Sequence, residues 1–297
     1  MPEIKRVAVA GATGNIGPAI VTELVEAGFE VTVFSRSSSA KTDSRARVQQ
    51  VDYDSKESLV AALKDQDALV NTLPMNVIPL DVHLRILDAA RAAGIKRYLP
   101  SEFGCDLSDK EIASLPVFAD KATIGDKLSE TSQQDPSFTW TRVYTGPFFD
   151  WGIEMNFFIN LKGPSTEIYN GGDVPVSSTN VAGVGQAVVG VLKHLEETKN
   201  RCVFASNTTF SQNKLLELSG NADKVKRVDV KAEDLLKRAD EALKQSSPDF
   251  KTAFVSQILY AIFAGKFGNH FTKTDNELLG VKSLSEAELT EVVKKYA

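Results

Sequence analysis

The stretch Gly11-Ala12-Thr13-Gly14-Asn15-Ile16-Gly17 decides the fold, because its three glycines separate an apolar run from an amphipathic segment. The run before it, Val7–Ala10, is apolar without alternation, which is typical of a strand buried on both faces. The apolar residues after the glycines recur on one helical stripe until Gly28 ends the pattern. The sequence therefore predicts a strand, a tight turn and a helix.

This glycine turn is also a candidate binding site. Glycines let a turn close tightly and let backbone N–H groups approach a ligand, while a helix N-terminus favours negative charge. A dinucleotide pyrophosphate fits such a place. The alternative is a strand-to-helix turn that holds no ligand. We favour dinucleotide binding because the glycines lie between the right elements.

The segment after the second expected strand, Glu30–Phe34, indicates which dinucleotide is preferred. A site for NAD places an Asp or Glu about 20 residues past the glycine turn, where it holds the ribose 2′-hydroxyl. This chain has Ser35 and Arg36 there, and a guanidinium suits a 2′-phosphate that a carboxylate would repel. The alternative is a solvated loop with an incidental arginine. We favour NADP(H), with Arg36 as the phosphate ligand.

The rest of the chain alternates strand-like and helix-like segments, which predicts an α/β fold with a doubly wound parallel sheet. We expect residues 1–150 to form the dinucleotide-binding domain and residues 151–297 to form mainly a smaller α/β substrate lobe. A strand near 201–205 returns to the main sheet in this prediction. Tyr169–Asp173 resembles a hairpin turn that leads into a short strand near 174–177.

Composition excludes several classes of partner. The net charge of −5 gives no basic footprint for nucleic acid. The longest apolar stretch, residues 254–264, is too short to span a bilayer, and the N-terminus has no apolar signal segment. Cys105 and Cys202 show neither metal-ligand spacing nor a disulfide framework. We therefore expect a cytoplasmic protein without a metal site or a membrane segment.

Ligands of open parallel sheets bind at the carboxyl ends of the strands, so the loop Leu73-Pro74-Met75 after the fourth strand should pass near a nicotinamide ribose. His83 lies beside the apolar stripe of the following helix. A histidine in this position is more often structural than an acid or base.

Residues after the third strand leave two interpretations open. Asp52 or Tyr53 is placed to flank an adenine, while Asp54 or Ser55 is placed to cap the next helix. A second open question concerns Phe148 and Phe149, which follow the sixth strand. They suit either the wall of an apolar substrate pocket or the core.

The segment Pro100-Ser101-Glu102-Phe103-Gly104 follows the fifth strand, and Lys121 opens a later helix. With the glycine turn, these features resemble, in matching order, the isoflavone-reductase-like and NmrA-like family of atypical short-chain dehydrogenases. The resemblance implies an NAD(P)-binding Rossmann fold and places the catalytic lysine at Lys121. No Tyr-x-x-x-Lys occurs in the sequence, so the tyrosine acid of ordinary short-chain dehydrogenases is missing.

By this resemblance, the chain is an NADPH-dependent oxidoreductase of secondary metabolism. The nicotinamide would deliver hydride to a small aromatic, phenolic or polyketide-type substrate, and Lys121 would act as acid or base. The alternative is a non-catalytic NmrA-like redox sensor that binds NADP and a partner protein, although a pure sensor has no evident need for the lysine. An epimerase with tightly held NAD is disfavoured by Arg36 and by the missing tyrosine. Either a monomer or a homodimer fits.

The candidate residues fall into two groups. The expected cofactor ligands are Gly11, Thr13, Gly14, Asn15, Ile16, Gly17, Ser35, Arg36, Leu73, Pro74, Met75, Glu102, Phe103, Lys121, Tyr144 and Pro147. The expected substrate wall is Met75, Phe103, Phe148 and Phe149.

Overall fold

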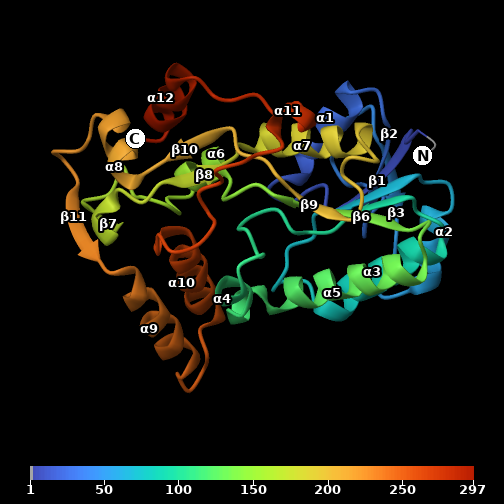
Figure 1. Ribbon diagram of the computed structural model, residues 1–297, viewed down its shortest axis with the longest axis horizontal. Coiled ribbons are helices and arrows are strands. Elements are labelled where there is room, and N and C mark those ends of the chain that lie inside the picture. Colours follow the sequence, from blue (N-terminus) through green and yellow to red (C-terminus); the bar gives the residue numbers. More distant parts are fainter. Residues whose placement is uncertain (1–2) are drawn as a thin grey trace.

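The computed structural model describes residues 3–297 and contains a central sheet of seven parallel strands (Figure 1). Their order across the sheet is β3-β2-β1-β4-β5-β6-β9, and every neighbouring pair is parallel. The strands are added toward one edge from β1 to β3 and toward the other edge from β4 onward. This reversal of strand order is the topology of a doubly wound Rossmann sheet, so the predicted fold class is confirmed. The strands are β1 (Arg6–Ala10), β2 (Glu30–Ser35), β3 (Arg47–Gln50), β4 (Ala68–Asn71), β5 (Arg97–Leu99), β6 (Thr139–Tyr144) and β9 (Arg201–Phe204).

Helices cover both faces of this sheet, and a separate apolar core fills each interface. The helices on one face are α1 (Gly17–Glu26), α7 (Val181–Lys193) and the short α11 (Asn276–Leu279). Those on the other face are α2 (Lys56–Leu63), α3 (Leu80–Ala92) and α5 (Ala119–Gln134). Ser55 caps α2 by accepting the Ser58 N–H, and Asn180 caps α7 in the same way. Of the two candidate caps before α2, Ser55 therefore performs this role.

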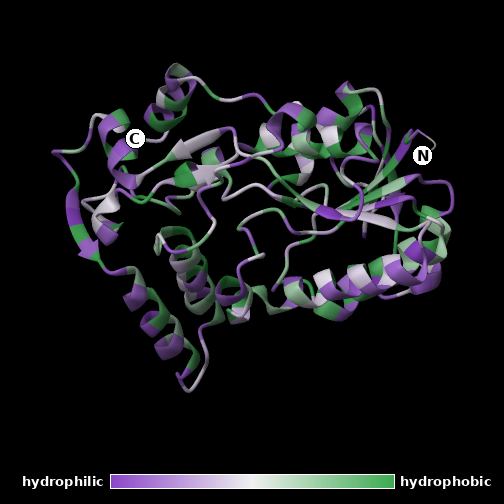
Figure 2. Cartoon of the chain, viewed as in Figure 1, coloured by the Kyte–Doolittle hydropathy of each residue, from purple (hydrophilic) through white to green (hydrophobic). Residues whose placement is uncertain are grey.

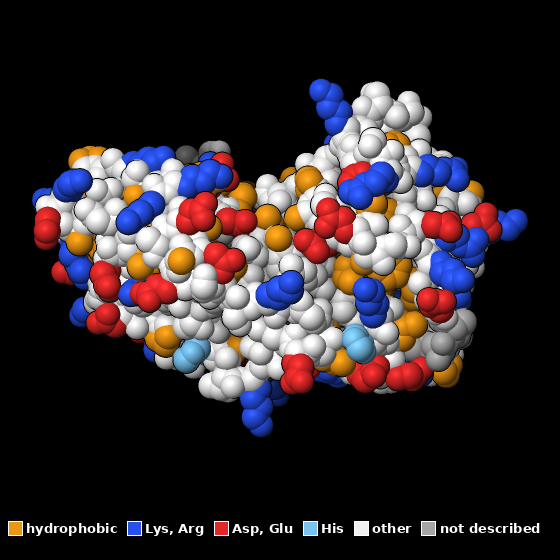
Figure 3. Space-filling model, turned by 90° about the horizontal axis from the view of Figure 1, so that it is seen from above, with side chains coloured by type: hydrophobic (Ala, Val, Ile, Leu, Met, Phe, Trp, Pro, Cys, Tyr) orange, Lys and Arg blue, Asp and Glu red, His pale blue; other side chains and the backbone are white. Residues whose placement is uncertain are grey.

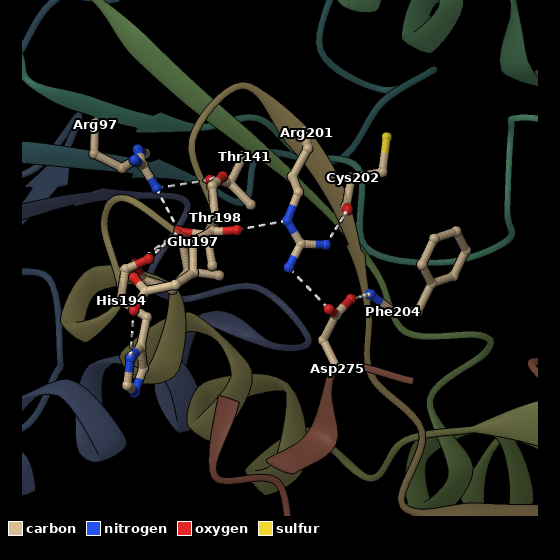
Figure 4. A network of polar contacts seen from close by, with 10 residues as sticks. Arg97, Thr141, His194, Glu197, Thr198, Arg201, Cys202, Phe204 and Asp275 are labelled. Atoms are coloured by element: carbon tan, nitrogen blue, oxygen red, sulfur yellow. Dashed lines mark hydrogen bonds and ion pairs between the residues drawn. The ribbon is translucent and has the colours of Figure 1, made fainter. Parts of the chain in front are cut away.

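A polar network around the buried Arg97 links the strands at the β9 edge of the sheet (Figure 4). Arg97 is fully buried and donates from Nη1 to Thr141 Oγ1 at 2.8 Å and Thr198 Oγ1 at 2.7 Å. Burial lowers the pKa of its guanidinium to about 10. Arg201 on β9 pairs with Asp275 at 2.8 Å. These contacts tie β5, β6 and β9 to the chain that leads into α11.

The second half of the chain contains two small sheets. β7 (Ser165–Tyr169) pairs parallel with β11 (Lys226–Val230), and β8 (Val176–Ser178) pairs antiparallel with β10 (Thr208–Phe210). The predicted hairpin at residues 169–173 is therefore wrong, because the strands on either side of that turn belong to different sheets. The chain leaves β7 through a single 3-10 turn, η2 (Asn170–Gly172), in which all three residues have positive φ.

The remaining helices pack around a third apolar core that these small sheets share. In Figure 2 the helices carry alternating hydrophobic and hydrophilic bands, as expected for elements with one buried side. The last helix begins with a capping box of Ser285 and Glu288. These elements are α4 (Lys110–Ala113), η1 (Pro116–Phe118), α6 (Phe149–Glu154), α8 (Gln212–Ser219), α9 (Ala232–Leu243), α10 (Phe250–Phe263) and α12 (Glu286–Lys295).

The surface seen in Figure 3 mixes Lys and Arg with Asp and Glu across the whole face. This pattern agrees with the small net charge of −5. Within residues 3–297, no helix has the length and apolar character needed to cross a membrane.

Candidate active site

A cleft of about 310 Å³ lies at the carboxyl ends of the central strands. Its walls come from the glycine turn, from the loops after β4, β5 and β6, from η1 and the start of α5, and from α10. The cleft therefore joins both halves of the chain. It is lined by Gly14, Asn15, Ile16, Thr72, Pro74, Met75, Asn76, Ser101, Phe103, Val117, Phe118, Lys121, Phe148 and Ile258.

The glycine turn is packed tightly on its inner side and open toward the cleft. Gly11 has φ +86°, and a Cβ there would lie 2.7 Å from Thr72. A Cβ on Gly17 would lie 2.4 Å from the Gly11 carbonyl oxygen. In contrast, a Cβ on Gly14 would meet only that carbonyl, at 3.3 Å. The turn thus needs Gly11 and Gly17 to close, while Gly14 leaves room for a ligand.

Helix α1 begins at this turn with uncapped N–H groups. Its N-cap residue, Ile16, makes no side-chain capping bond, and the first turn contains no acidic residue. The first N–H groups of a helix otherwise lack partners, and together with the helix dipole they favour an anion. An open glycine position beside an uncapped helix start fits the pyrophosphate of a dinucleotide.

Lys121 occupies the opposite wall as the third residue of α5. Its Nζ is half-buried and donates to the backbone carbonyl of Glu102 at 3.1 Å. Burial lowers the pKa of the amine, and the nearby Glu102 carboxylate opposes this shift in part. An amine with a lowered pKa gives up its proton more readily near neutral pH, as an acid or base requires.

The side chain of Glu102 pairs with Arg142 and not with Lys121. The carboxylate is fully buried and pairs with Arg142 Nη2 at 3.1 Å. This pairing raises the pKa of the Arg142 guanidinium against the opposing effect of its burial. The Gly104 carbonyl accepts the N–H groups of Thr145 and Gly146, at 3.1 and 2.9 Å, so the loop after β5 is fixed to the end of β6.

Several of the predicted site residues meet in the cleft. From the expected cofactor ligands and substrate wall, the cleft contains Gly14, Asn15, Ile16, Pro74, Met75, Phe103, Lys121 and Phe148. Gly11, Thr13 and Gly17 belong to the same turn but do not line the cavity, and Leu73 lies behind it with its N–H donated to Asn71 Oδ1.

Four predicted residues lie elsewhere. Phe149 is fully buried in the core, 5.8 Å from the ring of Phe210, so the prediction that it walls the cleft is wrong. It begins α6, and its side chain turns inward while that of Phe148 faces the cavity. Tyr144 is fully buried, with the Arg142 guanidinium 5.4 Å from its ring centroid.

Pro147 borders β8, where its carbonyl accepts the Thr179 N–H at 3.3 Å. Glu102 does not line the cleft, and it contacts Lys121 through its backbone carbonyl. Neither Pro147 nor the Glu102 side chain is among the lining groups.

Arg36, Asp52 and Tyr53 line a second hollow of about 460 Å³ beyond β2 and β3, while Ser35 does not line it. Arg36 is exposed there beside Asp52 and Tyr53. The Tyr53 hydroxyl donates to the Phe34 carbonyl at 3.2 Å, and Ser35 Oγ accepts the Ser37 N–H at 3.1 Å. The guanidinium is thus available to a phosphate.

His83 is buried behind the cleft. Asn71 Oδ1 accepts the Leu73 N–H, which fixes the orientation of the Asn71 amide. Its amide nitrogen therefore lies on the side of His83 and donates to Nδ1 at 3.2 Å. Burial, with a smaller effect of Lys121, lowers the pKa of His83 to about 4. Its place in the core fits the structural role favoured for it. Within residues 3–297, no three His, Cys, Asp or Glu side chains are grouped as a metal site requires.

Sequence reasoning missed several residues of the cleft. Asn76 has a positive φ of 64°, and an asparagine in a loop is a weak signal for that conformation. Ser101 stood inside a segment already singled out. Ile258 comes from α10, and no sequence pattern brings that helix to the end of the sheet. The missed residues are Thr72, Asn76, Ser101, Val117, Phe118 and Ile258.

The seven-stranded parallel sheet, with its glycine turn between β1 and α1, defines a Rossmann-type α/β protein. A model of the NmrA-like family matches residues 3–261, and the chain belongs to that family. The resemblance carried by the glycine turn, Pro100–Gly104 and Lys121 is thereby confirmed at the level of the family.

Individual relatives agree with this assignment. The oxidoreductase aprR of Aspergillus flavus is 35% identical over 216 residues, which cover 71% of each chain. The oxidoreductase poxI of Penicillium oxalicum is 32% identical over 214 residues, 70% of this chain and 67% of that protein. A solved structure described as AtPrR2 with NADP+ and (+)pinoresinol superposes over the full length of both chains with a TM-score of 0.79 at 20% identity.

Proposed function

We propose that this chain is an NADPH-dependent reductase of a small aromatic, phenolic or polyketide-type metabolite. The observation that carries the proposal is that Lys121, a half-buried residue, lines the same cleft as Gly14 and Asn15 of the glycine turn. The relatives aprR and poxI are named oxidoreductases, and the structural neighbour AtPrR2 holds NADP+ together with an aromatic ligand. These findings support the same class of reaction.

The residues that would hold the cofactor are those of the glycine turn, Arg36, and the loop after β4. The uncapped N–H groups of α1 suit the pyrophosphate, and the guanidinium of Arg36 suits a 2′-phosphate. Bound in this way, NADPH would supply the hydride for the reaction. The loop Pro74–Asn76 would lie beside the nicotinamide end, since it lines the cleft.

Lys121 would donate a proton to the substrate oxygen or accept one from it. Its Nζ donates to the Glu102 carbonyl at 3.1 Å, and among residues 3–297 this is its one hydrogen-bond partner, so an ammonium keeps further hydrogens for a ligand. Burial lowers the pKa of the amine, which makes its proton easier to release than that of an exposed lysine and suits a proton donor or acceptor. The Glu102–Arg142 pair keeps the nearest carboxylate occupied, so that Lys121 is not held in a salt bridge.

The cleft also limits the kind of substrate. The cleft of about 310 Å³ is at the small end of ligand pockets, which hold from about 300 Å³ upward, and in this proposal the nicotinamide end of the cofactor shares it, so the substrate must be small. Apolar side chains make up most of the lining, and they include Met75, Phe103, Phe148 and Ile258. Flat apolar rings with one oxygen at the lysine end match this distribution of groups.

A redox sensor of the NmrA-like kind remains the second candidate. It would use the same glycine turn and Arg36 and would have no need for an amine with a lowered pKa. Calorimetry with NADP+ and NADPH distinguishes the two: a strong preference for the oxidised form, without substrate-dependent oxidation of NADPH, favours the sensor.

The direct test incubates the protein with NADPH and a panel of phenolic enones and propenyl esters, followed by absorbance of the reduced cofactor. Lys121→Met removes the amine and keeps a flexible apolar side chain of similar length. We expect kcat to fall by about 100-fold or more, since general acid–base catalysis is worth about 10²–10⁴. The Kd for NADPH should stay within about twofold, and an unchanged kcat would refute the proposed role.

A further inference from the structure

The short turn η1 (Pro116–Phe118), which immediately precedes the helix of Lys121, is held from both sides by hydrogen bonds to its middle residue. The Val117 N–H donates to Gln257 Oε1 on α10 at 2.9 Å. The Val117 carbonyl accepts from Asn76 Nδ2 in the loop after β4, also at 2.9 Å. The turn is therefore fixed between the two halves of the chain.

Gln257 is an unusual residue for its position. It is only 3% exposed, on a helix whose neighbouring positions are mostly apolar, and it lies 140 residues from its partner in sequence. A buried amide side chain is costly unless its hydrogen bonds are made. The next residue, Ile258, lines the cleft, so this part of α10 contacts the site directly.

We propose that Gln257 is a positioning residue for Lys121, which it orients by fixing the Pro116–Phe118 turn at the start of α5. The inference rests on the proposed function, because it gives Lys121 the acid–base role. It adds that the second half of the chain sets the geometry of the catalytic amine. In this proposal, the Lys121 amine is correctly placed only when α10 is packed against the sheet domain.

The physical link runs through Val117. Without the Gln257 oxygen, the buried N–H of Val117 loses its only protein acceptor among residues 3–297, and the turn must shift to reach water. Lys121 follows four residues later, and it lines the same cleft as Val117 and Phe118. Water admitted there relieves the burial that lowers the pKa of the amine.

The charged and titratable groups that face Lys121 come from several elements. Glu102 and Cys105 lie in the loop after β5, Arg142 on β6 and His83 on α3. None of them is changed by a substitution at Gln257. A shift in the pKa of Lys121 in such a variant therefore reports the position and hydration of the amine.

The test compares Gln257→Met, an apolar residue of similar length, with the full-length wild type. The first measurement is the pH titration of Lys121 after reductive 13C-methylation, with its NMR signal assigned by loss in Lys121→Arg. We expect its pKa to rise toward the ordinary 10.5 by about half a unit or more. On a substrate that the wild type reduces, kcat should fall about tenfold, while KM and the Kd for NADPH change less than about threefold.

Two further variants keep the outcome decisive. Ser256→Ala removes a buried polar group from the same helix without touching Val117, and both its titration and its kcat should match the wild type. Gln257→Asn is the substitute if Gln257→Met does not fold. It keeps an amide on a shorter side chain, and it should shift the pKa of Lys121 in the same direction by a smaller amount. An unchanged Lys121 titration in whichever Gln257 variant folds overturns the inference. The titration needs no substrate, so it decides this point even if the wild type reduces none of the compounds and the proposed function fails.

Discussion

Substitution of Gly14 and of Gly17 by alanine should separate the binding role of the glycine turn from its structural role. A Cβ on Gly17 would lie 2.4–2.5 Å from backbone atoms of Gly11 and Ala12. No side-chain rotation relieves such contacts, so the backbone must move. A Cβ on Gly14 would meet one carbonyl oxygen at 3.3 Å and otherwise project into the cleft.

The expected free energies differ accordingly. Overpacking of this kind costs about 1–3 kcal/mol, so Gly17→Ala should lower the free energy of unfolding of the ligand-free protein by that amount. Gly14 has no positive φ, and alanine there gains about 0.4–1 kcal/mol by restricting the unfolded chain. That gain offsets the mild contact, and we expect the stability of Gly14→Ala to stay within about 1 kcal/mol of the wild type.

Affinity for NADPH should show the opposite order of effects. A methyl group on Gly14 would push the pyrophosphate away from the N–H groups of the turn. The loss of one hydrogen bond to a charged group costs about 1.5–3 kcal/mol. The Kd of Gly14→Ala should therefore rise about 10- to 100-fold.

Urea unfolding of the ligand-free proteins and calorimetric titration with NADPH measure the two quantities. If Gly14→Ala binds NADPH as tightly as the wild type, the dinucleotide does not lie on this turn. The proposed site would then have to be abandoned.

Two other predictions concern single side chains. Arg36→Ala should raise the Kd for NADPH about tenfold and leave the Kd for NADH unchanged, because only the first carries a 2′-phosphate for the guanidinium; equal effects on both would contradict the assignment. His83 has a pKa lowered to about 4 by burial, from 6.5, so the unfolded state binds its proton first and stability is lost as the pH falls between these values. Between pH 7 and pH 5 the free energy of unfolding should fall by about 2 kcal/mol more in the wild type than in His83→Gln, as measured by urea unfolding. An equal loss in both proteins would show that the ring is charged in the native state.

Local patterns were sufficient for most of the sheet domain. The glycine turn, the apolar first strand and a cap at Ser55, one of the two candidates for it, depend on neighbouring residues in the chain, and the structure has them where the sequence predicts them. The family resemblance added Lys121, whose place in the cleft depends on the packing of α5 and was not visible in any local pattern.

The failures are failures of long-range placement. Asn170 and Gly171 form a turn as predicted, but a turn signal does not say which strand pairs with which. The partner of β7 is β11, some sixty residues later: Ser165 is aligned with Lys226. Phe149 was open to two interpretations for the same reason, because only the direction of α6 decides which of two adjacent rings faces the cleft.

The segment after β5 shows how one residue can serve two purposes that a sequence pattern does not separate. The backbone carbonyl of Glu102 holds Lys121, whereas its carboxylate is taken up by Arg142. Had the carboxylate paired with the amine, the attraction would have raised the pKa of Lys121 and opposed proton release. Because Arg142 occupies it instead, the effect of burial on Lys121 prevails, and its pKa is lowered. The acid–base character proposed for Lys121 thus depends on an arginine that does not line the cleft.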